Sequence, residues 1–124
     1  MNVFLWVLAG ILAALFLAAG APKLLQSKEK VVQATGTWAV NYPPAAIKAI
    51  GLLEILGAIG LVLPAAVGIA AGLVPVAATG LAVVMAGAAV VHGRRGEGRS
   101  VAVNVLLLAL VAVVAWGRFG PYAF

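Results

Sequence analysis

A chain of 124 residues in which 65% are hydrophobic and only 9% are charged is too apolar to fold as a soluble domain. The sequence contains no cysteine, which excludes a thiol–disulfide relay, an iron–sulfur cluster held by this chain and a cysteine-based zinc site. The net charge of +5 comes from basic residues in short loops between apolar runs, which is typical of a protein beside anionic lipid. We therefore expect a membrane protein that contacts lipid and binds no nucleic acid.

Four apolar runs are long enough to cross a bilayer, which takes roughly 20 helical residues. They predict an all-α integral membrane protein, a four-transmembrane-helix bundle that forms one domain over residues 1–124. Four spans with short loops nearly exhaust the chain, so we expect no separate soluble catalytic domain. The expected helices are residues 3–22, 44–63, 67–91 and 100–116.

The first apolar run carries no charge and ends at Lys23. Its Ala19-Gly20-Ala21 segment has the small-residue spacing of a signal-peptide cleavage site. However, no basic segment precedes the run, and the run is too long for such a peptide. We interpret it as the first helix. Residues 26–42 are mixed in polarity, which is typical of an interfacial loop with a short helix.

Proline and serine mark the expected ends of the later helices. Pro44 begins the second helix, because proline is tolerated in a first helical turn, and Pro64 ends it. Pro75 lies inside the third helix, so a kink is expected near Ala71. Ser100 is the expected N-cap of the fourth helix.

Small residues recur at a four-residue spacing, which lets helices approach closely in lipid. The rows are Gly10, Ala14 and Ala18, then Gly68 and Gly72, then Ala78, Ala82 and Ala86. The general abundance of alanine and glycine accounts for part of this pattern. We expect the rest to mark faces where helices pack.

The placement of Lys and Arg predicts the orientation, because cytoplasmic loops carry an excess of both. The first and third loops contain Lys23, Lys28, Lys30, Arg94, Arg95 and Arg99, whereas the other side contains only Arg118. We therefore expect a multi-pass protein of the cell membrane with non-cytoplasmic N- and C-termini. Trp38 then lies at the cytoplasmic interface, as aromatic belts require.

Glu54 is the most informative residue, because it lies about ten residues, hence roughly 15 Å, into the second span and near the bilayer midplane. A carboxyl group there costs a few kcal/mol and usually marks a function or a buried partner. It shares a helical stripe with Gly51 and is expected to face the bundle interior. Desolvation favours its protonated form, which suits acid or base chemistry. The alternative is a structural pairing with Lys48, Lys23 or His92.

Three further polar residues fall near the cytoplasmic end of the bundle. His92, the single histidine, is either a solvated interfacial residue or a proton carrier. One histidine cannot build a metal site without another chain, so we expect no metal. Asn104 is either a hydrogen-bonding link between helices or a ligand contact. Glu97 either neutralises the arginines around it or joins this group.

These residues predict one polar pocket that opens towards the cytoplasmic leaflet. Glu54 is expected within hydrogen-bond or water-bridged reach of Lys23, His92 or Asn104, because a carboxyl group at that depth needs a polar partner. Lys48 is less suited, since six residues along one helix place it on a different side. Glu54 and His92 are the candidate catalytic residues, and the candidate substrate-binding residues are Lys23, Asn104, Met85 and Trp38.

The sequence also resembles a known family. The run from Gly51 to Leu61, the histidine-to-glutamate segment of residues 92–97 and the Gly-Arg-Phe-Gly-Pro ending of residues 117–121 are similar to the DoxX-like family. The resemblance implies a four-helix architecture and a functional carry-over to Glu54, His92 and Glu97. It also implies either an accessory membrane subunit or a small enzyme that acts on lipophilic molecules.

Two functions remain open from the sequence. The first is an intramembrane enzyme or binding protein for a lipophilic small molecule, such as a quinone, isoprenoid or polyketide-like intermediate. It would use cofactor-free acid/base chemistry centred on Glu54, in an isomerisation, cyclisation or epoxide opening. The alternative is a non-catalytic membrane subunit that docks a soluble oxidoreductase through the basic loops near Lys28 and Arg95. A homo-oligomer stays open in both cases.

Overall fold

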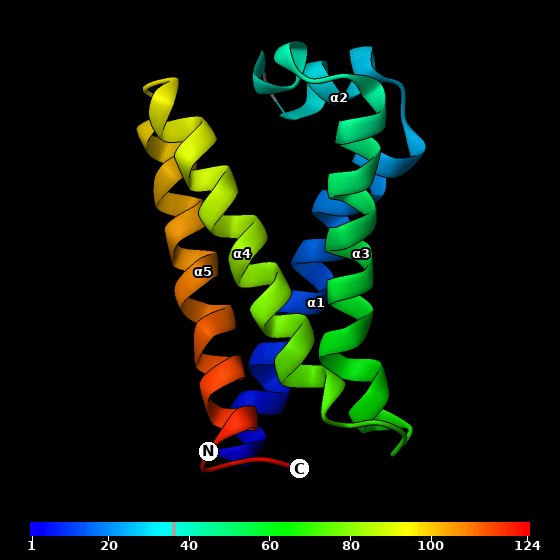
Figure 1. Cartoon of the computed structure of the whole chain (residues 1–124), viewed down its shortest axis with the longest axis vertical. Helices are drawn as coiled ribbons and strands as arrows, with labels where there is room; N and C mark the ends of the chain where they lie inside the picture. The colour runs from blue at the N-terminus through cyan, green and yellow to red at the C-terminus, as the bar shows by residue number, and fades with distance from the viewer. Residues whose placement is uncertain (36) are drawn as a thin grey trace.

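The computed structural model describes residues 1–35 and 37–124, together with the side chains of all of these except residues 34, 35 and 37. The described residues form helices and short connections and contain no strand (Figure 1). The fold class is therefore the expected all-α class. The elements are α1 (Asn2–Leu25), α2 (Lys28–Thr35), the 3-10 helix η1 (Thr37–Asn41), α3 (Pro44–Ala66), α4 (Leu73–Arg94) and α5 (Gly98–Phe119).

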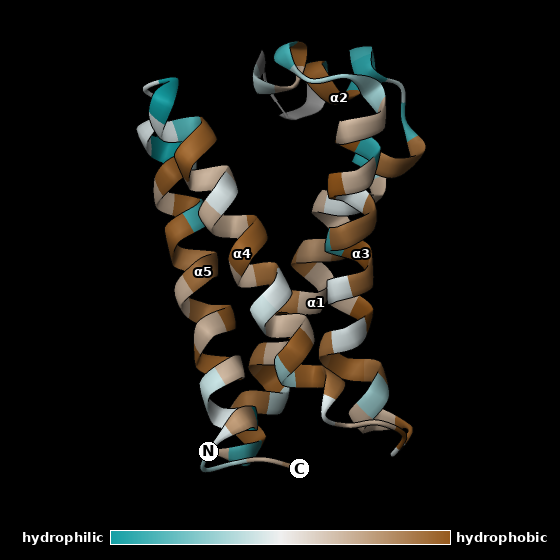
Figure 2. Cartoon of the chain, in the orientation of Figure 1, coloured by the Kyte–Doolittle hydropathy of each residue, from teal (hydrophilic) through white to brown (hydrophobic). Residues whose placement is uncertain are grey.

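Four of the helices, α1, α3, α4 and α5, are each long and apolar enough to cross a membrane. Their outward faces carry large apolar side chains such as Val3, Leu53, Val83 and Leu106, all more than half exposed. Figure 2 shows the same pattern, with hydrophobic residues along the helices and hydrophilic residues mainly near their ends. Such a surface is stable in lipid and not in water, which identifies a multi-pass membrane protein.

The helices pack as two antiparallel pairs, α1 with α3 and α4 with α5, joined by contacts between α3 and α4. Helix α1 is tilted, so it lies against α5 near Gly117 and against α3 near Gly51 (Figure 1). The core between the pairs contains Phe16, Leu61 and Leu81, each at most 1% exposed. In Figure 1 the ribbons of α4 and α5 diverge from α3 towards the end that carries α2.

The close helix crossing occurs at Gly20 and Gly51. A Cβ atom on either glycine would lie only 2.7 Å from the carbonyl oxygen of the other, so both positions require glycine for this approach. The expected row of Gly10, Ala14 and Ala18 is wrong, because all three are exposed on the outer face of α1. In the third-helix row, Ala78 is fully buried, Ala82 is partly buried and Ala86 is exposed.

The third transmembrane helix begins later than expected, at Leu73 rather than at residue 67. Residues 67–72 form a turn in which Gly68 and Ala70 have positive φ angles of 70° and 52°. Pro75 therefore lies in the first turn of α4, where its missing N–H costs no intrahelical hydrogen bond, and no kink near residue 71 results. Gly68 and Gly72 lie in the turn, and a Cβ atom on either would meet nothing within 4 Å, so their expected role in close helix packing is wrong.

Two other helix ends also differ from the expectation. Helix α3 continues past Pro64 to Ala66, because proline has a helical φ and removes only one hydrogen bond of the last turns. Helix α5 begins at Gly98, with Glu97 rather than Ser100 at the N-cap position. The helix therefore starts two residues before the expected cap.

The connection between α1 and α3 folds over one end of the bundle (Figure 1). Val31, Trp38, Ala39 and Ile47 form a small buried cluster there, and the Nζ atom of Lys28 donates a 2.9 Å hydrogen bond to the carbonyl oxygen of Val40. The expected short helix in this loop is present as α2, with η1 after it. The chain termini lie together at the opposite end of the bundle (Figure 1).

Candidate functional site

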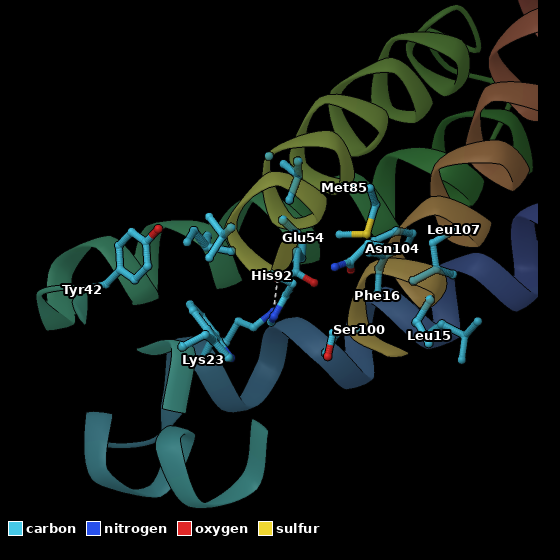
Figure 3. Close-up of a pocket in the computed structure, with 18 of the residues that line it drawn as sticks. Leu15, Phe16, Lys23, Tyr42, Glu54, Met85, His92, Ser100, Asn104 and Leu107 are labelled. Carbon is cyan, nitrogen blue, oxygen red and sulfur yellow. Dashed lines mark hydrogen bonds and ion pairs between the residues drawn. The ribbon is translucent and has the colours of Figure 1, made fainter. Parts of the chain in front are cut away.

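A cavity of about 640 Å³ is bounded by residues of all four transmembrane helices at the end of the bundle that carries α2. Its lining includes all six residues that the sequence singled out for catalysis or substrate binding, and all of these except Trp38 are labelled in Figure 3. These residues are Lys23 of α1, Trp38 of η1, Glu54 of α3, Met85 and His92 of α4, and Asn104 of α5. The structure therefore brings together residues that lie up to 81 positions apart, as the difference between 104 and 23 shows.

Lys23 and Glu54 form an ion pair on the wall of this cavity. The Nζ atom of Lys23 donates a hydrogen bond of 2.5 Å to Oε1 of Glu54, drawn as a dashed line in Figure 3. Glu54 is 1% exposed, whereas the side chain of Lys23 is 15% exposed. The expected contact between these two residues is confirmed. Lys48 takes no part, because its Nζ atom donates to the carbonyl oxygen of Leu24 instead.

The ion pair offsets the free-energy cost of burying the Glu54 carboxylate. Two charges taken out of water lose several kcal/mol of hydration each, and only a close, hydrogen-bonded partner repays that loss. The Nζ atom of Lys23 also lies 5.7 Å from the centroid of the Trp38 ring, a cation–π contact. Glu54 is thus held in position while its carboxyl group remains on the cavity wall.

His92 is oriented by Glu97. Nδ1 of His92 lies 2.9 Å from Oε1 of Glu97, and Nε of Arg95 donates to the same oxygen at 2.9 Å. These contacts hold the pKa of Glu97 below its usual range, with the hydrogen bond from His92 as the largest cause. A carboxylate accepts hydrogen bonds only, so Nδ1 carries the proton and Nε2 is left for other partners. Glu97 itself lies outside the cavity lining and acts on it through His92.

Asn104 provides an unused hydrogen-bond donor. Its Nδ2 atom is buried and has no hydrogen-bond partner among the described residues. The expected role of Asn104 as a hydrogen-bonding link between helices is therefore not seen at this nitrogen. Buried polar atoms are almost always satisfied in folded proteins, so this nitrogen on the cavity wall is available to a water molecule or a ligand.

The rest of the cavity wall is mostly apolar. Phe16 and Met85 are 1% and 5% exposed and line the cavity together with Leu15, Val84 and Leu107. Met85 precedes His92 by seven helical residues, which is about 10 Å along α4. The cavity thus carries polar side chains such as His92 and Arg99 near the end of the bundle with α2, and apolar side chains such as Phe16 deeper in the bundle. This arrangement fits a molecule that is largely hydrocarbon with a polar group at one end.

Sequence reasoning missed three polar residues of the lining, Tyr42, Arg99 and Ser100. In the sequence Tyr42 belongs to the expected interfacial loop, Arg99 is a topology signal and Ser100 is the expected helix cap. The spacing of Ser100 and Asn104 was a usable signal, because residues four apart share one face of a helix. No group of three or more metal-ligating side chains occurs in the part of the chain that the structure describes.

A second polar cluster lies at the other end of the bundle. Arg118 is only 5% exposed, and its Nη1 atom donates to Oδ1 of Asn2 at 2.6 Å and to the carbonyl oxygen of Tyr122 at 2.9 Å. Its guanidinium carbon also lies 3.9 Å from the ring centroid of Phe124. Sequence reasoning treated Arg118 as a simple loop charge. In the structure its guanidinium group contacts both terminal segments of the chain, Asn2 near the N-terminus and Tyr122 and Phe124 near the C-terminus.

Comparison with known proteins bears on this geometry. A sequence model described as the DoxX-like family matches residues 7–114, which include every residue of the cavity lining. Comparison with curated proteins and with solved structures finds no match. The match covers most of the chain and agrees with the resemblance noted in residues 51–61 and 92–97. This chain belongs to the DoxX-like family of membrane proteins.

Proposed function

We propose that this protein binds a lipophilic small molecule within the membrane and carries out cofactor-free proton transfer on it. The observation that carries the proposal is the buried Lys23–Glu54 ion pair on the wall of a large, mainly apolar cavity. The volume of about 640 Å³ lies within the range of small-molecule sites, which is roughly 300–1,000 Å³. An ion pair is an unfavourable choice for a purely structural contact at this depth, because apolar residues of similar size often stabilise as well or better.

The pair supplies both halves of a proton transfer. The carboxylate of Glu54 accepts a proton from an acidic C–H or O–H group of the bound molecule, while the ammonium group of Lys23 stabilises the negative charge that develops. Glu54 then returns the proton to a different atom of the same molecule, so no outside reagent is consumed. His92 and Asn104 would orient a polar group of the substrate through Nε2 and Nδ2.

This chemistry suits an isomerisation, a cyclisation or an epoxide opening. Each proceeds by moving a proton and needs a site from which water is largely excluded. A quinone, an isoprenoid or a polyketide-like intermediate matches the apolar wall formed by residues such as Phe16 and Met85. Such molecules dissolve in the bilayer and would reach the cavity from the membrane.

The alternative function is a non-catalytic subunit that docks a soluble oxidoreductase. It would use the basic loops, but Lys28 already donates to the Val40 carbonyl oxygen and Arg95 to Glu97. These contacts do not prevent docking. However, both side chains already use a donor group within this chain. The docking function also gives no role to the cavity, so we place it second.

Filling the cavity tests the proposal. Ala88 lines the cavity, whereas Ala86 on the same helix is exposed and does not. We expect lipophilic molecules to be extracted from the purified wild-type protein and from Ala86→Phe, and to be strongly depleted in Ala88→Phe. Mass spectrometry of the extracts measures this. Equal retention by both variants would contradict a ligand in the cavity and favour the docking subunit.

A further inference from the structure

The charges on the cavity wall do not balance. Lys23 and Arg99 are cations, Glu54 is the one carboxylate among the described lining residues, and its charge is matched by Lys23. Arg99 is exposed and takes part in none of the ion pairs found among the described residues. Two cations against one anion leave one positive charge. The polar end of the cavity therefore favours a negative charge in its ligand.

Helix α5 also presents a hydrogen-bond donor without an acceptor among the described residues. Ser100 and Asn104 lie four residues apart on one face of α5, next to Arg99, and all three line the cavity. The Nδ2 atom of Asn104 is buried without a partner. A ligand that offers several acceptor oxygens would satisfy this nitrogen and neutralise the guanidinium group together.

Resting on the proposed function, we propose that the ligand is an anionic amphiphile whose head group is a carboxylate or a phosphate. The head group lies between Arg99 and Asn104, with Lys23 across the cavity. The hydrocarbon part extends towards Phe16 and Met85, and Met85 lies about two helical turns along α4 from His92. Repulsion by Glu54 is small, because Lys23 neutralises that carboxylate at 2.5 Å.

The chemistry of the donors argues for an anion rather than a neutral polar group. A guanidinium group pairs with a carboxylate or phosphate through two parallel hydrogen bonds, a geometry that an alcohol or ester cannot match. A neutral ligand would also leave Arg99 without a counter-charge on the side that faces the cavity. The head group is therefore the part of the ligand that the site distinguishes.

Trp38 offers a local probe of this site. It lines the cavity, is 8% exposed, and is one of three tryptophans in the chain. Replacing Trp6 and Trp116 by Phe makes it the only fluorescent indole. Three probes are then titrated in detergent: stearic acid brominated near its carboxyl end, its methyl ester, and phosphatidic acid with the same brominated chain. We expect the acid or the phosphatidic acid to quench Trp38 at concentrations about tenfold lower than the ester.

Matched variants assign the effect to the head group. Arg99→Gln and Asn104→Leu should each remove most of the preference for the anionic probes. Arg94→Gln makes the same charge change at the nearby end of α4, but Arg94 does not line this cavity, so the preference should remain. A stronger response to stearic acid or to phosphatidic acid supports the proposal and identifies a free carboxylate or a lipid phosphate as the head group.

Two results separate the proposals. If the methyl ester quenches as strongly as the acid, or if Arg99→Gln retains the preference, the proposal of an anionic head group is wrong. The proposal that the cavity binds a lipophilic molecule is not affected by either result. If none of the three probes quenches Trp38, the proposed function itself fails, and with it this inference.

Discussion

Lys23 and Glu54 each lie three residues after the glycine at which their helices cross. Gly20 and Gly51 bring the backbones of α1 and α3 together. Because the two helices run antiparallel, Lys23 lies beside Gly51 and Glu54 beside Gly20, and the long Lys23 side chain spans the crossing so that its Nζ atom is 2.5 Å from Oε1 of Glu54. The two side chains could not meet in this way if the helices were separated by a larger residue at the crossing. Helix packing and the position of the candidate catalytic carboxylate are therefore linked.

Adding one methyl group at the crossing should disturb both features. The Cβ atom of Gly51→Ala would lie 2.7 Å from the Gly20 carbonyl oxygen, so the backbones must move apart. We expect a loss of about 1–3 kcal/mol in stability, the usual range for overpacking. Gly80→Ala is the matched control, because nothing lies within 4 Å of its Cβ position. Thermal unfolding in detergent compares them, and equal melting temperatures would show that the crossing tolerates the added group.

Removing one partner of the buried ion pair should cost more than removing both. Lys23→Met leaves Glu54 without a counter-charge, which in buried pairs costs about 3–5 kcal/mol, and the partial exposure of Lys23 places the expected loss at the lower end. The double variant Lys23→Met/Glu54→Gln should recover part of that loss. A double-mutant cycle from unfolding in detergent measures the coupling. Additive effects would mean that the pair contributes no interaction energy.

The contact between Glu97 and His92 predicts a pH dependence. The pKa of Glu97 is lower in the folded protein than its usual value, so the unfolded chain binds the proton first as the pH falls. The stabilisation is fully present above the usual carboxyl pKa of about 4.3 and is lost as the pH falls through the lower, folded value.

Glu97→Gln should therefore melt below wild type at pH 7, and the difference should shrink as the pH falls below about 4. Thermal unfolding of both proteins across this range is the measurement. Glu29→Gln, a carboxyl group on α2 at the same end of the bundle, is the control. A difference that stays constant with pH would show that the charge of Glu97 is not the cause.

The orientation in the membrane is a separate prediction. Seven of the eight Lys and Arg residues, Lys48 included, lie at the end of the bundle with α2 or around the connection between α4 and α5, whereas Arg118 lies at the end with the termini. The positive-inside rule then places both termini outside the cytoplasm. A topology reporter fused after Phe124 should give a non-cytoplasmic signal, and the same reporter inserted after Gly96 should give a cytoplasmic one. The reverse pair of signals would invert the orientation.

The sequence was a good guide to the helices and to the deep polar residues. Apolar runs define membrane spans directly, and a polar residue inside such a run is rare enough to mark the site, as Glu54 and Asn104 did. The start of α4 was missed because residues 67–72 are as apolar as the helix that follows. Hydropathy has no signal for a turn that consists of Val, Gly, Ile and Ala.

Which face of each helix points inwards was harder to predict. In a soluble protein the polar face of a helix marks the outside. In lipid both faces of α1 are apolar, so hydropathy could not predict that Gly10 faces outwards and Gly20 inwards. The place of Arg99 in the cavity lining was not predicted, because the positive-inside rule already explains a basic residue between two membrane spans. Only the three-dimensional arrangement shows that it lines the cavity.

The most direct test is an experimental density map of the protein purified from its membrane, at a resolution that resolves side chains and bound lipids. We expect elongated density in the cavity, with its polar end within hydrogen-bond distance of the Lys23–Glu54 pair or Asn104 and its apolar end beside Phe16 and Met85. A cavity closed by side chains, or a Glu54 that faces lipid, would contradict this expectation.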